Sequence, residues 1–245
     1  MPESRIKKPI WISHRGYTAN AVENTYAAFK AAVDMGFTFL ETDLRITRDN
    51  HIVLIHDHTL NRLASDSRCV SDLTRREIES FKLANGEHFF FLDQFLESFG
   101  SCSWTLDIKP ENGKQTIQRL AAWVGENNFF NQFKEQAKFL TWMPEHEKLL
   151  NAYFPGADYY ARKTECWRAG LAAFFGLPAL GGIKANRTYA LPASLRNISL
   201  FKQSIVSRFH NRNAKNIAFL PASDDLVKKA LNANFDEILT NGKIL

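Results

Sequence analysis

Two histidines each end a short apolar run in the first quarter of the chain. His14 follows residues 10–13, Ile-Trp-Ile-Ser, and His56 follows residues 52–55, Ile-Val-Leu-Ile. An imidazole with its ordinary pKa of about 6.5 can donate or accept a proton at neutral pH. Two imidazoles can therefore act as the acid and base of one reaction, as phosphodiester cleavage requires. The other five histidines are interpreted as structural: His51, His58, His88, His146 and His210.

The spacing of three acidic residues also points to a site. Side chains alternate along a strand, so Glu41 and Asp43 share one side of their strand, as do Asp107 and Lys109. Three carboxylates buried together would repel one another, and a cation is the simplest compensation. Oxygen ligands favour Mg²⁺ or Ca²⁺ over zinc. In the alternative interpretation each carboxylate pairs with its own basic residue: Arg15, Arg45 or Lys109.

The elements that must position these residues alternate between apolar runs and helix-like patterns, which is typical of a parallel α/β sheet. Eight strands are predicted at residues 10–13, 37–44, 104–108, 138–142, 158–161, 179–185, 216–220 and 237–240. Helices are predicted at residues 21–35, 92–99, 114–126, 144–154, 166–175, 195–212 and 223–233. The turn signal Asp49-Asn50 predicts a hairpin after the second strand.

The whole chain, residues 1–245, is therefore predicted to be one domain, a (β/α)8 TIM barrel of the α/β class. Residues 58–88 interrupt the alternation and are interpreted as a small insertion within the barrel. Active sites of such barrels lie at the C-terminal ends of the strands. The histidines and carboxylates named above fall at those ends.

Composition narrows the function classes. Lys and Arg total 31 against 26 Asp and Glu, a net charge of +5 that favours anionic ligands. No basic run alternates with aromatics, so nucleic acid is not an expected partner. Cys69, Cys102 and Cys166 are widely spaced without a CxxC pair, which argues against a disulfide framework or a zinc site.

One stretch, residues 166–183, approaches the length of a membrane span and includes Leu171 and Phe175. Arg168 and the helix breakers Gly176 and Pro178 argue against a span. The sequence predicts a buried helix followed by a strand, with no stable membrane insertion. Because no signal-peptide pattern follows the N-terminal charges, a cytoplasmic location is expected.

Five motifs in order resemble the signature of the glycerophosphodiester phosphodiesterase family. They are His14-Arg15-Gly16, Glu23-Asn24-Thr25, Glu41-x-Asp43, His56-Asp57 and Asp107-x-Lys109. The resemblance covers residues 10–111 and resumes at residues 238–241. Each motif alone is common, whereas five in register are specific. The resemblance also implies the barrel fold and an insertion after the second histidine motif.

The resemblance implies a role for each matched residue. His14 and His56 would be the catalytic pair, with His56 as base and His14 as acid. One divalent cation, Mg²⁺ or Ca²⁺, would be bound by Glu41, Asp43 and Asp107. The substrate phosphate would be held by Arg15 and Lys109, and Glu23 would orient the first loop through Arg15.

The implied substrate is a small phosphodiester. In the mechanism usually proposed for the family, the glycerol 2-hydroxyl attacks its own phosphorus, the alcohol leaves, and the cyclic phosphate is hydrolysed. The sequence departs from the family pattern at Val22, Asp107, Trp142 and the Leu220-Pro221 pair. Trp142 and Leu220-Pro221 concern the substrate pocket, and no oligomeric state is predicted.

Two other functions remain open. Phospholipase D-type cleavage of lysophospholipids would use the same fold and metal site. A non-catalytic phosphate-binding barrel is the alternative of a different class, and retention of every reacting residue argues against it.

Overall fold

The computed structural model describes residues 8–84, 86–195 and 198–244. The chain groups into two compact units. One is Ser13–Asp158, and the other combines Met1–Ile12 with Tyr159–Leu245. Strand β1 (Ile10–His14) runs across the boundary between them, as does the short strand β6 (Asp158–Tyr159).

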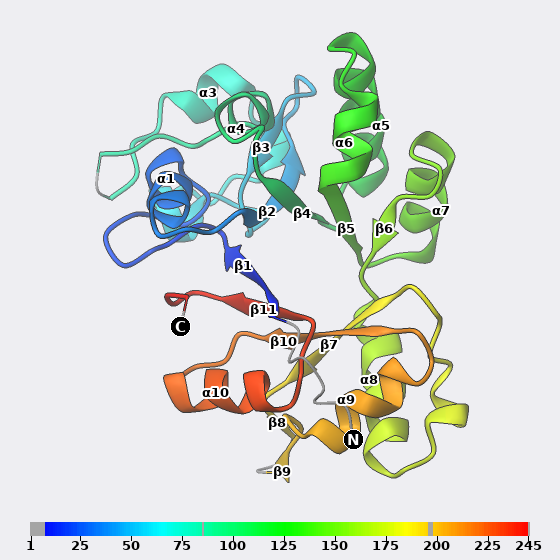
Figure 1. Cartoon of the computed structure of the whole chain (residues 1–245). Coiled ribbons are helices and arrows are strands. Elements are labelled where there is room, and N and C mark those ends of the chain that lie inside the picture. The colour runs from blue at the N-terminus through cyan, green and yellow to red at the C-terminus, as the bar shows by residue number, and fades with distance from the viewer. Residues whose placement is uncertain (1–7, 85, 196–197, 245) are drawn as a thin grey trace. The chain divides into compact units, whose positions relative to one another are not determined.

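The unit Ser13–Asp158 contains three adjacent parallel strands. They are β2 (Phe39–Ile46), β4 (Ser103–Ile108) and β5 (Ala137–Thr141). The helices between or after them are α1 (Tyr26–Asp34), α4 (Leu92–Ser98), α5 (Gly113–Glu126), α6 (Phe130–Gln136) and α7 (Pro144–Tyr153) (Figure 1). Strand and helix alternate as predicted, and α6 was not expected. The register sets Asp43 of β2 directly beside Asp107 of β4.

Helix α1 begins later than the predicted residue 21 because the backbone before it is not helical. Asn24 has a φ of 57°, and Thr25 is extended at the N-cap, where its side chain accepts a hydrogen bond from the Ala28 N–H. This bond satisfies one of the free donors at the helix start. The helix then buries Phe29, and its end before Gly36 agrees with the prediction.

The predicted hairpin is present. Strand β3 (Ile52–Leu54) runs antiparallel to β2, and Asn50 in the turn takes a φ of 64°. The expected excursion after it contains three short helices: α2 (Asn61–Ala64), the 3-10 helix η1 (Val70–Asp72) and α3 (Arg75–Glu79). Their buried apolar side chains, such as Val70 and Ile78, pack with Val53 of β3. The excursion therefore shares one apolar cluster with β3.

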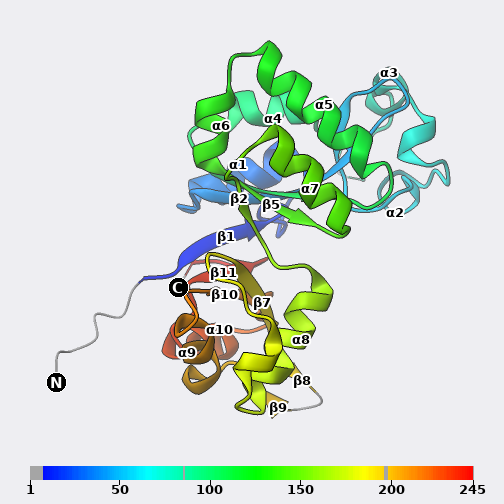
Figure 2. The same ribbon diagram turned by 90° about the vertical axis from the view of Figure 1, so that its right-hand side faces the viewer.

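The unit that includes Tyr159–Leu245 contains three more parallel strands, with β10 between β7 and β11. They are β7 (Thr188–Pro192), β10 (Lys215–Phe219) and β11 (Glu237–Thr240). The helices are α8 (Lys163–Phe174), the 3-10 helix η2 (Pro178–Gly181), α9 (Gln203–His210) and α10 (Asp224–Asn232). Both views show α8 beside β7 (Figures 1 and 2).

Two predicted elements in this unit are wrong. The strand expected at residues 179–185 is replaced by η2 and a turn in which Gly182 has a φ of 61°, and the strand starts only at Thr188. The helix expected at residues 195–212 is shorter, because β8 (Ser194–Leu195) and β9 (Ile198–Ser199) pair as antiparallel strands before α9. Residues 196 and 197 of that prediction lie outside the described residues.

The helix predicted at residues 166–175 is present, yet its burial is incomplete. Leu171 is 40% exposed and Phe175 is 70% exposed. Among the residues that the structure describes, no helix is both long and apolar enough to span a bilayer.

Candidate active site

Three buried carboxylates converge where β2 and β4 lie side by side. Glu41 and Asp43 come from β2, and Asp107 comes from β4. Each offers one oxygen, and these oxygens all lie within 4.8 Å of one another. The two-residue spacing on β2 and the pairing of Asp43 with Asp107 together produce this convergence.

Two basic side chains enter the same cluster. The Lys109 Nζ lies 2.6 Å from an oxygen of Asp43 and 2.6 Å from an oxygen of Asp107. The Arg15 Nε lies 2.9 Å from the second Asp43 oxygen, which also accepts a hydrogen bond from the Asn24 amide at 2.9 Å. The sequence offered two alternatives, convergence of the three carboxylates or pairing of each with a basic residue. The structure shows the convergence together with ion pairs to Arg15 and Lys109.

Arg45, the third basic residue considered, serves a different group. Its guanidinium contacts Glu111 at 2.9 Å and donates two hydrogen bonds to the backbone oxygen of His56. Arg45 thus fixes the backbone of the second histidine and leaves the acidic cluster to Arg15 and Lys109.

The pKa values show how unevenly the cluster is neutralised. Burial opposes ionisation of Asp43, but Lys109 and Arg15 outweigh it and lower its pKa to about 2. Burial, reinforced by the charges of Asp43 and Asp107, holds the pKa of Glu41 well above its usual value. Burial also raises the pKa of Asp107. Three carboxylates face two cationic side chains, so further positive charge at Glu41 would be stabilising.

This donor set fits a hard divalent cation. Carboxylate oxygens with water in the remaining positions are what Mg²⁺ and Ca²⁺ bind. Burial and the charges of Asp43 and Asp107 raise the pKa of Glu41, and a cation among these oxygens would offset that negative charge. The residues able to hold such an ion are Glu41, Asp43 and Asp107.

His14 reaches this cluster from the end of β1. Its Nε2 lies 3.9 Å from an oxygen of Glu41. The next residue, Arg15, has a φ of 58°, and its N–H donates to the Glu41 carbonyl at 3.0 Å. Gly16 completes the turn with a φ of 83°, where an added Cβ would lie 2.5 Å from the Ala28 backbone. The turn therefore requires glycine and holds His14 beside the carboxylates.

His56 is brought to the same region by the hairpin. The Ile55 N–H donates to the Asp43 carbonyl at 3.1 Å, and His56 is the next residue. Its Nδ1 lies 2.9 Å from Asp57. Burial opposes ionisation of Asp57, but hydrogen bonds from Arg62 and His56 outweigh it and lower its pKa. An ionised carboxylate only accepts hydrogen bonds, so Nδ1 is the donor to Asp57, and in the neutral ring Nε2 is then the acceptor.

Glu23 links the two histidine loops. One Glu23 oxygen lies 3.3 Å from the Arg15 guanidinium and 2.6 Å from the Arg62 guanidinium. Arg62 contacts Asp57 at 2.6 Å, and Asp57 contacts His56. The predicted contact of Glu23 with Arg15 is present. No motif or spacing pointed to Arg62, which lies in the excursion.

Trp142 borders the cluster at the end of β5. Its indole N–H donates to the Asp107 carboxylate at 2.8 Å, and the Lys109 Nζ lies 5.7 Å from its ring centroid. The side chain is 41% exposed, as Met143 is at 40%. The sequence marked position 142 as unusual but gave no sign of this hydrogen bond.

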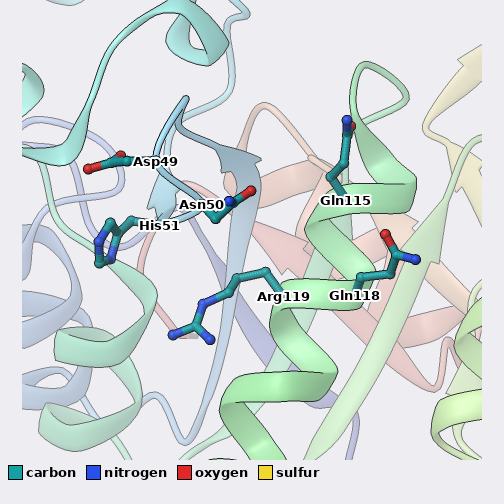
Figure 3. Close-up of a pocket in the computed structure, with 6 residues that line it drawn as sticks. All are labelled: Asp49, Asn50, His51, Gln115, Gln118 and Arg119. Atoms are coloured by element: carbon teal, nitrogen blue, oxygen red, sulfur yellow. The ribbon is translucent and has the colours of Figure 1, made fainter.

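A hollow of about 450 Å³ lies between the β2–β3 turn and α5 (Figure 3). It is lined by Asp49, Asn50, His51, Gln115, Gln118 and Arg119. Asp49 accepts a hydrogen bond from Thr47, and Arg119 pairs with Glu126. No predicted site residue lines this hollow.

Comparison with known proteins gives matches along the whole chain. The model of the Glycerophosphoryl diester phosphodiesterase family matches residues 14–242. The "Probable glycerophosphodiester phosphodiesterase 2" of Mycobacterium tuberculosis is 33% identical over 246 residues, covering 95% of this chain and 87% of the relative. Lysophospholipase D GDPD1 of Homo sapiens is 34% identical over 114 residues, covering 41% of this chain and 36% of the relative. Alignments with several other curated relatives also span less than half of the relative's length.

The structure resembles solved members of the same group. The glycerophosphoryl diester phosphodiesterase domain of a Mycobacterium tuberculosis protein superposes with a TM-score of 0.80 at 13% identity, covering 96% of this chain and 97% of that one. At this identity the likeness shows the fold alone. The predicted α/β TIM barrel is thereby confirmed.

Proposed function

Because the chain belongs to the Glycerophosphoryl diester phosphodiesterase family of enzymes, we propose that it hydrolyses glycerophosphodiesters to glycerol 3-phosphate and an alcohol. The observation that carries the proposal is the buried trio Glu41, Asp43 and Asp107, with its two basic partners and with His14 at 3.9 Å. The barrel as a single catalytic domain and a cytoplasmic location stay predictions of the sequence.

Glu41, Asp43 and Asp107 are proposed to hold one Mg²⁺ or Ca²⁺ ion. When bound, the ion would offset the negative charge of the phosphoryl oxygens and favour deprotonation of a hydroxyl beside it. The cationic partners of Asp43 support this role because they keep its carboxylate ionised. Ion binding at Glu41 would compete with a proton, since its pKa is raised.

His56 is proposed as the base and His14 as the acid. With its Nδ1–H donating a hydrogen bond to Asp57, His56 presents Nε2 to a substrate hydroxyl. The Asp57 carboxylate also offsets the positive charge that the ring gains on taking the proton. His14, only 12% exposed and adjacent to Glu41, would return a proton to the leaving alkoxide.

Arg15 and Lys109 are proposed to bind the phosphate. A guanidinium has five N–H donors, and the contacts of Arg15 with Asp43 and Glu23 engage its Nε and Nη1. Lys109 is held between two carboxylates, which keep its ammonium charged: burial would lower its pKa, but Asp107 and Asp43 raise it. Both side chains thus bring fixed positive charge to the place where a phosphodiester would lie.

The direct test measures release of glycerol 3-phosphate from glycerophosphocholine and glycerophosphoethanolamine. The chain is treated with a chelator and assayed with Mg²⁺, with Ca²⁺ and with neither. We expect turnover only with a cation, and a loss of at least about 10²-fold in kcat/KM for His14→Ala and for His56→Ala. His58→Ala, an exposed histidine two residues beyond His56, is the matched control. A cation-loaded chain that cleaves neither these diesters nor lysophospholipids would refute an enzymatic function.

Lysophospholipids are a second candidate substrate class. The human relative is named a lysophospholipase D. Trp142, which contacts Asp107, is 41% exposed, and the next residue, Met143, is 40% exposed. We expect Trp142→Ala to lower kcat/KM for lysophosphatidylcholine more than for glycerophosphocholine. The ratio of the two values cancels any shared effect of losing the hydrogen bond to Asp107. An unchanged ratio would exclude Trp142 from acyl-chain binding.

A further inference from the structure

The outer face of α8 displays large apolar side chains. Trp167, Leu171 and Phe175 follow one another at four-residue spacing, which places them on one face of the helix. Their exposed fractions are 47%, 40% and 70%. A single exposed leucine needs no explanation, but several large apolar side chains exposed on one helix face are a common feature of interaction sites.

The inner face of α8 carries the small residues. Ala169 and Ala173 are fully buried, and they belong to the core cluster that includes Leu191 of β7. Gly170 lies on the same side, where an added Cβ would contact Leu191 at 3.4 Å. A helix of a globular protein usually turns its large apolar side chains to the core. In α8 the fully buried positions carry small residues, and Phe174 is only partly buried against the same core, while Trp167 and Leu171 are exposed.

The apolar surface continues past the end of the helix. Gly176, with a φ of 79°, ends α8 through hydrogen bonds from its own N–H to Ala173 and from the Leu177 N–H to Ala172. Beyond this turn Leu177 is 55% exposed and Leu180 is 73% exposed. The surface formed by Trp167, Leu171, Phe175, Leu177 and Leu180 is called the α8 apolar surface below.

Two arginines hold this arrangement in place. Arg208 of α9 donates hydrogen bonds to the carbonyls of Ala173 and Phe174 at the end of α8. Arg168 donates from its Nε to the Gly181 carbonyl at 3.1 Å, which ties η2 back to the helix. These bonds use side-chain donors to satisfy backbone acceptors at both ends of the turn. The apolar side chains are thus displayed by an ordered segment.

Basic residues predominate in the part of the sequence that includes and follows most of α8. Residues 166–223 contain eight Lys or Arg residues and no Asp or Glu. Of the chain's 31 basic residues, 23 therefore lie elsewhere, against all 26 acidic ones. The rest of the chain is net negative by three, so the positive excess comes entirely from this segment. Arg168, Lys202 and Lys215 are exposed, whereas the Lys184 Nζ pairs with Glu165 at 2.8 Å.

We propose that the α8 apolar surface binds the surface of an anionic phospholipid bilayer. Large apolar and aromatic side chains on one helix face, in a segment of excess positive charge, are what interfacial binding to anionic lipids uses. Trp167 suits the boundary between headgroups and acyl chains. The helix lies on the bilayer in this proposal and does not cross it. The proposal is independent of catalysis.

Flotation of the full chain with vesicles tests the proposal without any turnover. The vesicles are phosphatidylcholine alone or phosphatidylcholine with phosphatidylglycerol. We expect binding to the anionic vesicles that weakens as salt is raised. The double variant Phe175→Ser/Leu180→Ser should lower the partition coefficient by about tenfold or more, because both side chains lose apolar area that binding would bury. Leu171→Ser is a second variant, and unchanged thermal unfolding verifies that each variant is folded.

Tyr153→Ser, at an exposed aromatic of α7, is the matched control and should bind as the wild type does. Equal binding by the double variant and the control overturns the proposal, as does equal binding to neutral and anionic vesicles. A third outcome also overturns it: light scattering shows a dimer that the double variant dissociates, while vesicle binding is unchanged. That result would assign the surface to a second copy of the chain.

Discussion

The acidic cluster and the α8 apolar surface invert the usual distribution of residues in opposite ways. In the first, Glu41, Asp43 and Asp107 are charged groups placed in the interior; in the second, large apolar groups are placed in water. The buried charges are largely compensated inside the protein, by Lys109 and Arg15. The compensation for exposed apolar area would come from outside, by binding. A buried polar site depends on the precise positions of a few atoms, whereas an exposed apolar surface depends on the area that binding can bury.

The largest effect is expected for Asp43→Asn, which removes the carboxylate shared by Lys109 and Arg15. We expect kcat/KM to fall by about 10³-fold or more, because a cation ligand and an electrostatic anchor are lost together. The free energy of unfolding should fall by about 3 kcal/mol, since a buried ammonium loses a partner. Steady-state kinetics and urea unfolding measure the two effects. Asp34→Asn, in an exposed helix pair with Lys30, is the control, and a similar loss there would contradict the assignment.

A smaller effect is expected for Asp57→Asn. An amide can donate as well as accept, so the tautomer of His56 is no longer fixed, and the bridge through Arg62 to Glu23 is weakened. We expect kcat to fall about 10²-fold with little change in KM, together with an altered pH profile. Asp66→Asn, at a half-buried carboxylate paired with the exposed Arg68, should leave both constants unchanged. A change confined to KM would indicate that Asp57 acts on binding alone.

Glu41→Gln tests the electrostatics of the cluster without turnover. Burial and the neighbouring carboxylates raise the pKa of Glu41 in the folded state. Between the ordinary and the raised pKa the folded state binds more protons than the unfolded state, so the free energy of unfolding falls as pH rises. The Glu41→Gln variant has no carboxylate at this position to ionise. Without metal it should therefore be more stable than the wild type at pH 7 by roughly 1 kcal/mol or more.

Thermal unfolding across pH, with and without Mg²⁺ or Ca²⁺, measures this effect. Added cation should stabilise the wild type more than the Glu41→Gln variant, because the variant lacks one charged ligand. If the free energy of unfolding depends on pH in the same way for the two metal-free proteins, ionisation of Glu41 does not destabilise the folded state.

The smallest effect sharpens the contrast between the two faces of α8. Phe175→Ser should change the free energy of unfolding by less than about 0.5 kcal/mol, because its side chain is already 70% exposed. Ala173→Leu on the inner face should cost about 1–3 kcal/mol through overpacking of a fully buried site. Chemical denaturation of both variants measures the difference. Equal costs would mean that Phe175 belongs to the core.

The sequence alone determined the local features of this protein. Alternation along β2 set Glu41 and Asp43 on one side, and the breakers Gly176 and Pro178 ended helix α8 within the apolar stretch of residues 166–183. Five motifs in order identified the family, which the match over residues 14–242 confirms. Such features are readable because strand period, turn chemistry and motif spacing act over a few residues.

Only the tertiary structure decided which distant groups meet. The contact of Trp142 with Asp107 and the bridge from Glu23 through Arg62 join segments that no local pattern connects. Likewise, the apolar character of residues 166–183 predicted burial, but the side of α8 that packs on β7 carries alanine and glycine. Periodicity identifies an apolar face; which face is covered depends on the space that the neighbouring elements leave. That space left Phe175 and Leu180 outside.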